Sequence, residues 1–322
     1  IKMFDKLGVK ILGLVDNMSF FKADDGKKYN LFGEGGVKKT AEEFNKEFLG
    51  EIPIHPNVGK SGDNGKPIVE ENPDNEISKI YINFGNSDEK LSQMGLGCFS
   101  MSGAYGIGND EESLATIQLA LDLGITLLDT SASYGQGHNH RLIGKALKNG
   151  RREKVFIHSK SGTIKTDQGS KAEGSGTPAR LRELCETSLQ NLGTDYLDAF
   201  CMSRIDPSVP VEESVGGMGR LVEEGKTRFI GLSEASPESL KRGYTEHPLV
   251  SLQYEYSLWT RDVENGHLAA CEELGMAMMA YAPLGYGFLT GTITEESGLE
   301  QEDTRQKFPR FKPDNMKKNL EK

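Results

Sequence analysis

Short apolar runs alternate with amphipathic stretches from about residue 91 to the end of this chain. The apolar runs have strand length and lie at 93–98, 126–128, 155–157, 197–202, 228–232, 250–252 and 276–280. Helix-length stretches separate them, at about 110–123, 138–148, 178–192, 211–224, 236–246 and 263–274. Such alternation is typical of a parallel sheet, because each helix returns the chain to the same edge. The sequence therefore predicts an α/β fold with seven parallel strands.

Three polar residues follow the ends of two predicted strands. Asp129 and Tyr134 come after the run 126–128, and Lys160 comes after the run 155–157. In a parallel α/β barrel, the carboxyl ends of the strands face the active site. The charge of Lys160 favours the phenolate and is expected to lower the pKa of Tyr134, while Asp129 holds the lysine. We therefore predict that Tyr134 protonates a carbonyl oxygen as a hydride reaches its carbon.

The surrounding motifs resemble the aldo-keto reductase superfamily, from about residue 91 to the end. They are Met94–Gly97, Gly124–Thr130, Tyr134–Gly135, Ile143–Leu147, Lys160, Leu189–Asp198, Arg204–Pro207, Gly225–Ser233 and Tyr281–Gly285. The resemblance implies a (β/α)8 barrel of the TIM type, the cofactor NADPH, and reduction of an aldehyde or ketone to an alcohol. It also implies that Asp129, Tyr134 and Lys160 match three members of the catalytic tetrad. Each of the three, taken alone, is equally well explained as a cap, a loop aromatic or a surface charge.

At the fourth tetrad position, where the family usually has a histidine, this chain has Ser203. A serine hydroxyl can donate a hydrogen bond to a carbonyl oxygen, but it brings no imidazole. The resemblance also implies that Gln253 bonds to the nicotinamide carboxamide and that Tyr281 stacks on its ring. The full set of cofactor-binding residues implied by the resemblance is Ser233, Gln253, Tyr281, Leu284 and Gly285.

The first 80 residues follow another pattern. Val9–Val15 and Phe48–Pro53 read as strands, and Thr40–Phe48 reads as a short helix. The segment resembles the C-terminal part of the Mrp/NBP35 ATPases, which carry and insert iron–sulfur clusters. The runs that carry this resemblance are Ile11–Phe20, Leu31–Gly36, Phe48–Pro56 and Gly65–Val69.

This second resemblance implies that Asn17 and the loop after Pro53 lie against an adenine base. The family's P-loop is missing, and the interval between Phe21 and Phe32, where its CxxC belongs, has no cysteine. Thiolates are the ligands of such clusters. We therefore expect a partial P-loop-NTPase-like α/β segment at 1–80, a linker at 81–90 and the barrel at 91–322.

Both ends of the chain suggest a piece of something longer. The sequence starts at Ile1 without a methionine, and Asn315–Lys322 reads as the start of a seventh helix. We expect a barrel that lacks its last strand and helices. In the family, that part carries the basic residues that hold the 2′-phosphate and pyrophosphate of NADPH.

The bulk properties narrow the function classes. The net charge is -10 with no basic run, which argues against nucleic acid and membrane surfaces as partners. No apolar run approaches the ~20 residues of a membrane helix. The cysteines are far apart, which favours free thiols in the cytoplasm and no metal site.

The expected function is NADPH-dependent reduction of a small carbonyl substrate, with the oligomeric state open. The alternatives are a non-catalytic fusion remnant and a binding protein related to ATP-dependent iron–sulfur carriers.

Overall fold

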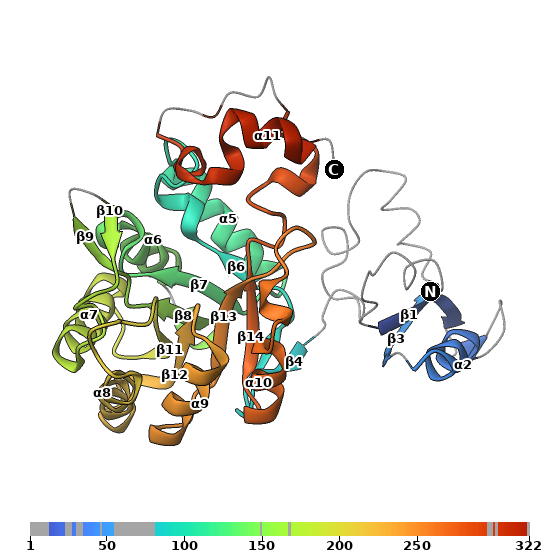
Figure 1. Ribbon diagram of the computed structural model, residues 1–322, viewed down its shortest axis with the longest axis horizontal. Coiled ribbons are helices and arrows are strands. Elements are labelled where there is room, and N and C mark those ends of the chain that lie inside the picture. The colour runs from blue at the N-terminus through green and yellow to red at the C-terminus, as the bar shows by residue number, and fades with distance from the viewer. Residues whose placement is uncertain are drawn as a thin grey trace. The chain divides into compact units, whose positions relative to one another are not determined.

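The structure, a computed structural model, describes residues 13–22, 28–29, 35–45, 47–54, 81–148, 150–166, 169–294, 299 and 302–320. These residues fall into two units, Ile1–Ile80 and Tyr81–Lys322. Figure 1 shows the second unit as a curved sheet with helices around it.

The described part of the first unit is a small α/β arrangement. β1 (Gly13–Lys22) pairs with β3 (Glu47–Ile54) in parallel and with β2 (Lys28–Tyr29) in antiparallel orientation. α2 (Gly36–Glu43) lies between β2 and β3 in the chain, as expected because parallel strands need a crossover connection. The helix begins four residues before the predicted start at Thr40.

The second unit contains one parallel sheet in which spatial neighbours are also chain neighbours. Its strands are β6 (Leu96–Gly97), β7 (Leu127–Ser131), β8 (Phe156–Lys160), β11 (Leu197–Met202), β12 (Thr227–Ser233), β13 (Ser251–Glu255) and β14 (Ala277–Tyr281). The helices between them are α5 (Asp110–Asp122), α6 (His138–Ala146), α7 (Pro178–Leu192), α8 (Val211–Glu223), α9 (Pro237–Glu246) and α10 (His267–Leu274). The predicted parallel barrel architecture is confirmed, and β6 and β14 form the edges of the sheet within the described residues.

Local sequence signals explain where these helices begin and end, as α7 illustrates. The hydroxyl of Thr177 accepts a hydrogen bond from the backbone amide of Arg180, and Pro178 occupies the first turn, where no helical amide is needed. Gly193 ends the helix with φ 68°, a left-handed conformation that glycine adopts without strain. The buried residues of α7 recur at helical spacing and turn one face to the sheet: they are Leu181, Cys185, Ser188 and Leu192.

The central strands carry the core. Every residue of β8 and β11 is buried, because one side faces the helices and the other faces the barrel interior. Between sheet and helices the packing is apolar, with fully buried side chains such as Ile157, Phe200 and Met218. All four cysteines are buried free thiols, so none of them forms a disulfide. In the described part of the chain, no helix is both long and apolar enough to cross a membrane.

A hairpin closes the amino-terminal end of the barrel. β4 (Tyr81–Asn83) pairs with β5 (Lys90–Ser92) in antiparallel orientation. Phe84 in its turn packs its ring 4.9 Å from that of Phe156. Asn86 donates a hydrogen bond to the carbonyl of Leu274, 3.0 Å away. Residues 81–90, which the sequence assigns to a linker, therefore fold as part of the second unit.

The segment after β14 lies across the opposite end of the barrel. It contains η6 (Thr304–Lys307), η7 (Pro309–Phe311) and α11 (Pro313–Leu320), and the last of these is the predicted seventh helix. The amide of Thr304 donates to the carbonyl of Ala104, which follows β6. Arg310 forms an ion pair of 2.6 Å with Glu255, the last residue of β13. The segment, which follows β14 in the chain, thus contacts both the loop after β6 and the carboxyl end of β13.

Replacing Phe84 by alanine is expected to lower the free energy of unfolding by about 3–5 kcal/mol, because the buried ring leaves a cavity at the base of the barrel. Denaturant unfolding measures the loss. Ile82→Ala in the same hairpin is the control: Ile82 is 45% exposed, and its loss should be about 0.5 kcal/mol or less. Equal losses in both variants would contradict this role of the hairpin.

Candidate active site

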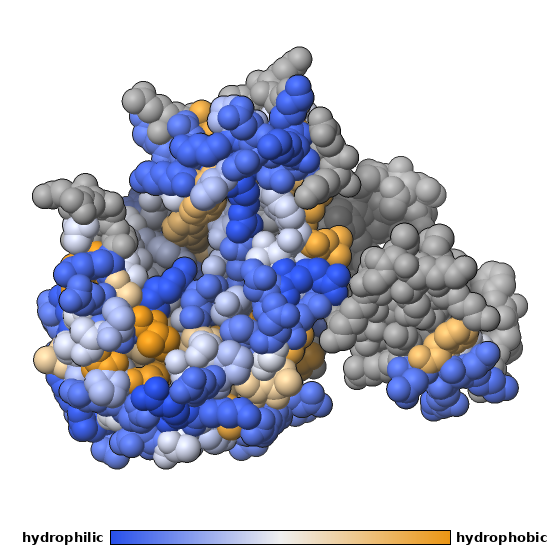
Figure 2. All heavy atoms as spheres, in the orientation of Figure 1, coloured by the Kyte–Doolittle hydropathy of each residue, from blue (hydrophilic) through white to orange (hydrophobic). Residues whose placement is uncertain are grey.

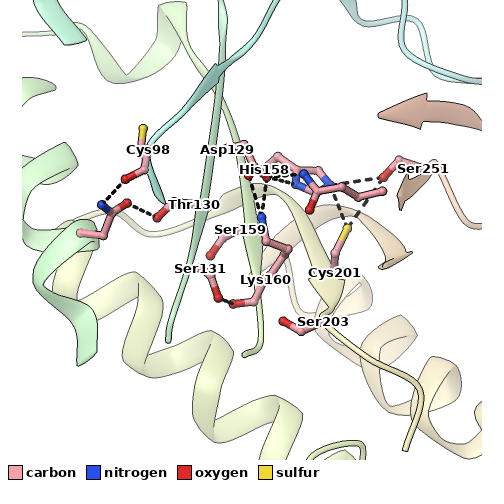
Figure 3. A network of polar contacts seen from close by, with 12 residues as sticks. Cys98, Asp129, Thr130, Ser131, His158, Ser159, Lys160, Cys201, Ser203 and Ser251 are labelled. Atoms are coloured by element: carbon pink, nitrogen blue, oxygen red, sulfur yellow. Dashed lines mark hydrogen bonds and ion pairs between the residues drawn. The ribbon is translucent and has the colours of Figure 1, made fainter. Parts of the chain in front are cut away.

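The centre of the site is an ion pair between neighbouring strands. Lys160 Nζ lies 2.7 Å from Asp129 Oδ1 and 2.8 Å from Oδ2, so the lysine contacts both oxygens. The strand register explains the contact, because β7 pairs with β8 such that Ser131 lies opposite Lys160 and Asp129 lies opposite His158. Figure 3 shows the pair inside the barrel, reached from two adjacent strands. The prediction that Asp129 contacts Lys160 agrees with this geometry.

Because the pair is buried, the pKa of each residue depends strongly on the charge of the other. Burial alone raises the pKa of Asp129, but the charge of Lys160 and a hydrogen bond from His158 outweigh it and lower this pKa to about 2. Burial likewise lowers the pKa of Lys160, but the charge of Asp129 outweighs it and raises this pKa to about 12. Both groups are therefore charged across the whole neutral range.

Tyr134 lies beside the lysine, in a 3-10 turn that follows β7 (η2, Tyr134–Gly137). Lys160 Nζ is 5.3 Å from the centre of its ring, and the ring of Phe99 packs against it at 4.8 Å. The sequence-based prediction that the pKa of Tyr134 is lowered is wrong for the net effect. Burial raises this pKa by more than Lys160 lowers it. Tyr134 is therefore a protonated phenol at neutral pH.

Ser203 directly follows β11 and joins the same end of the barrel. Its hydroxyl oxygen accepts a hydrogen bond of 2.7 Å from the amide of Gly162, which follows β8. Its own amide donates to the hydroxyl of Ser161 at 3.2 Å. Cys201 lies opposite Lys160 in the register, so Ser203 is two residues beyond the lysine level. The structure thus brings Ser203 to the carboxyl end where Lys160 also lies.

Two of the predicted cofactor residues, Ser233 and Gln253, lie opposite each other on β12 and β13. Both are almost fully buried. Gln253 Nε2 donates a hydrogen bond of 2.9 Å to Asp129 Oδ1, across the barrel interior. Gln253 is therefore connected directly to the ion pair, a contact that the sequence did not indicate.

The remaining predicted cofactor residues follow the end of β14. The hydroxyl of Tyr281 donates to Glu234 Oε1 at 2.9 Å. Gly285 adopts φ 58°, and a side chain there would meet the ring of Trp259. Leu284 is exposed. Their contact with a cofactor stays a prediction.

Unusual backbone conformations gather at these strand ends. Glu234, Ala282 and Tyr286 all have positive φ, of 55°, 50° and 59°. Such conformations cost about 1–3 kcal/mol for residues with a side chain and persist mainly where function requires them. They follow β12 and β14, so the carboxyl end of the barrel is the strained end.

A further polar group, which the motifs of the sequence did not indicate, lies next to the ion pair. His158 Nδ1 lies 3.0 Å from Asp129 Oδ1, and its Nε2 lies 2.9 Å from the sulfur of Cys201. Ser251 Oγ is 3.4 Å from the same nitrogen. The available signal was strand periodicity: His158 is two residues before Lys160, so both side chains share one face of β8. Figure 3 shows this group beside Asp129 and Lys160, with Cys201 and Ser251 to the right of His158.

In the first unit, the register pairs Asn17 with Ile52. Asn17 and Pro53 therefore lie at neighbouring positions of two adjacent parallel strands. The chain that follows Ile54, where the adenine-facing loop is predicted, is outside the described residues, and the adenine contact stays a prediction. Among the described residues of both units, no grouping of His, Cys, Asp and Glu side chains can hold a metal ion.

Each of the two parts of the chain matches the model of a known protein family. Residues 93–322 match the model of the aldo/keto reductase family. Residues 1–87 match the model described as NUBPL iron-transfer P-loop NTPase, which confirms the resemblance of the first segment to that class. The probable aldo-keto reductase 1 of Glycine max is 40% identical over 240 residues, which are 74% of this chain and 68% of the relative.

Solved structures of the same family superpose on the barrel. The glycerol dehydrogenase of Gluconobacter oxydans is 30% identical, covers 74% of each chain and has a TM-score of 0.65. An aldo/keto reductase of Klebsiella pneumoniae, solved with NADP and acetate, is 28% identical over 65% of this chain and 70% of its own, with a TM-score of 0.56.

Removing one partner of the Asp129–Lys160 ion pair is expected to destabilise the protein more than its share of removing both partners. Lys160→Met should lower the free energy of unfolding by about 3–5 kcal/mol, because it leaves the charge of Asp129 buried without its main partner. The double variant Asp129→Asn/Lys160→Met should lose less than the sum of the two single losses. Denaturant unfolding of the four proteins gives the coupling energy, and additive losses would contradict the pairing.

Proposed function

This chain belongs to the aldo/keto reductase family, and from this we propose that it uses NADPH to reduce an aldehyde or ketone to an alcohol. The observation that carries the proposal is the contact of Lys160 with both Asp129 and the ring of Tyr134 at the carboxyl end of the barrel. A phenol beside a fixed ammonium suits proton transfer to a carbonyl oxygen.

In the proposed reaction, the hydroxyl of Tyr134 donates its proton to the carbonyl oxygen. The raised pKa of Tyr134 keeps the phenol protonated at neutral pH, so the acid form is available for reduction. As the proton leaves, the ammonium of Lys160 stabilises the phenolate that remains. Asp129 holds the ammonium in place and offsets its charge in the buried site.

The polar groups at the strand ends fit a nicotinamide. Ser233 ends β12 and lies opposite Gln253, the middle residue of β13, and the hydroxyl and amide groups of these residues suit hydrogen bonds to a carboxamide. Gln253 donates a hydrogen bond from Nε2 to Asp129, and its Oε1 can act as an acceptor. Tyr281 is only partly buried and offers its ring for stacking, with Leu284 and Gly285 beside it. The cofactor, when bound there, supplies the hydride.

Ser203 takes the place of the tetrad histidine in this proposal. Its hydroxyl oxygen accepts from the amide of Gly162, which fixes the oxygen and leaves the hydroxyl proton to donate. We propose that this proton orients the carbonyl oxygen of a small substrate. The class of aldehyde or ketone depends on the loops at the carboxyl end of the barrel.

Tyr134→Phe is expected to abolish NADPH-dependent reduction of a panel of aldehydes and ketones, followed by the loss of nicotinamide absorbance, because no proton reaches the carbonyl oxygen. Binding of NADPH, followed by fluorescence, should persist. Tyr105→Phe is the matched control, because Tyr105 also packs on Phe99 but does not contact Lys160. Unchanged turnover in Tyr134→Phe would refute the proposal. Absence of both turnover and NADPH binding in the unaltered protein would favour a non-catalytic remnant.

Ser203→Ala should lower kcat by roughly 10²-fold, the loss associated with one preorganised donor. Ser203→Thr keeps the hydroxyl and should retain most of the rate. A common loss in both variants would mean that the bulk of residue 203, and not its hydroxyl, determines turnover. Steady-state kinetics on one aldehyde substrate provide the comparison.

A further inference from the structure

The barrel interior beneath the ion pair is polar where an apolar layer is usual. Barrel interiors are generally filled by branched apolar side chains. Here the interior positions below Asp129 and Lys160 carry His158 from β8, Cys201 from β11 and Ser251 from β13, and none of the three is exposed. Burying a polar group is unfavourable unless it is hydrogen-bonded. This layer therefore exists because its contacts offset that cost.

The geometry fixes the proton on His158 Nδ1. Asp129 is ionised, and a carboxylate can only accept hydrogen bonds. The nitrogen 3.0 Å from Asp129 Oδ1 must therefore be the donor. The other ring nitrogen faces Cys201 Sγ at 2.9 Å and Ser251 Oγ at 3.4 Å. It accepts a hydrogen bond from these groups when the ring is neutral and donates a hydrogen bond to them when the ring is charged.

A glycine makes room for this arrangement. Gly231 on β12 lies between Cys201 and Ser251 in the register. A methyl group at Gly231 would lie 2.6 Å from Cys201 Sγ and 2.6 Å from Ser251 Oγ. These are distances that real side chains do not tolerate, so the absence of a side chain on β12 allows the two groups to meet His158 Nε2.

The side chains of this layer do not contact solvent. His158, Cys201 and Ser251 are each 0% exposed. Of the two residues of the ion pair, Asp129 is the one to which His158 hydrogen-bonds. The imidazole orients a neighbour and carries no proton to the surface.

We propose that His158 is a positioning residue, which holds the Asp129 carboxylate so that both of its oxygens stay on Lys160 and the ammonium stays on Tyr134. The proposal rests on the proposed reductase function. Asp129 Oδ1 accepts hydrogen bonds from Lys160, His158 and Gln253, whereas Oδ2 accepts a hydrogen bond from Lys160. The donors from His158 and Gln253 prevent the carboxylate from turning and leave the lysine bound to both oxygens.

The charged and titratable groups that face His158 are Asp129 from β7, Lys160 from its own strand and Cys201 from β11. Burial lowers the pKa of His158, but Cys201 and Asp129 outweigh it and raise this pKa to about 9. Tyr134 ionises at still higher pH. At neutral pH the His158 ring is therefore charged, and during an alkaline titration it becomes neutral before Tyr134 ionises; in both forms Nδ1 keeps its proton for Asp129.

Two substitutions separate the hydrogen bond from the bulk of the ring. In His158→Asn, the amide nitrogen occupies the place of Nδ1 and still donates to Asp129. In His158→Leu, an apolar side chain fills a similar volume and donates nothing. The pKa of Tyr134 is measured from tyrosinate absorbance as the difference between each protein and its Tyr134→Phe counterpart. The kcat of aldehyde reduction is measured over the same pH range.

His158→Leu is expected to raise the pKa of Tyr134 by about one unit, because a less firmly held ammonium stabilises the phenolate less. Its kcat should fall roughly tenfold or more with little change in KM. His158→Asn should keep both values close to those of the unaltered protein. Equal shifts in the two variants, or no shift in His158→Leu, would overturn the proposal.

The absorbance titration keeps the inference separate from the reductase assignment. If the unaltered protein does not turn over, the proposed function fails, but the pKa of Tyr134 still reports on His158. If His158→Leu does not fold, Cys201→Ala tests the same point, because it removes the sulfur at Nε2 and leaves Asp129 untouched. It should move the pKa of Tyr134 in the same direction by a smaller amount, and an unchanged value would count against the proposal.

Discussion

The ion pair between Asp129 and Lys160 is the interaction on which the rest of the site depends. Two opposite charges in a buried site are stable only if each keeps its partner. The pair therefore fixes the ends of β7 and β8 relative to each other, and the turn that carries Tyr134 follows from β7. Polar contacts from Gln253 and His158 converge on the same carboxylate. Strands on both sides of the barrel are thus tied to one group.

The edges of the sheet are held by segments outside it. In the described residues β6 and β14 end the parallel sheet, and an open edge exposes unpaired backbone groups. The hairpin of β4 and β5 packs at one end of the barrel, and the segment that includes α11 contacts the loop after β6 and the end of β13 at the other. On the face shown in Figure 2, the described surface of the second unit is largely hydrophilic, with apolar patches between.

The sequence predicted the strands and helices of the barrel because their periodicity is local. It also predicted the meeting of Asp129 and Lys160, because parallel strands bring their carboxyl ends together. It could not predict the sign of the pKa shift of Tyr134, because that depends on burial by residues distant in the chain, such as Phe99. The role of residues 81–90 was missed for a similar reason: the contact of Phe84 with Phe156 spans long sequence separation. The contacts of His158 depend on the curvature of the sheet, which brings Ser251 on β13 within 3.4 Å of His158 on β8.

The polar layer also restricts how this sequence can evolve. If Cys201 or Ser251 became apolar, the imidazole would lose a partner for Nε2, and if Gly231 gained a side chain, both partners would be displaced. An ordinary apolar layer is thus reached only when several positions change together, since each intermediate leaves a buried polar atom unsatisfied. Descendants of this chain are expected to keep or lose His158, Cys201, Gly231 and Ser251 as a set. Substitutions at these four positions should therefore be epistatic.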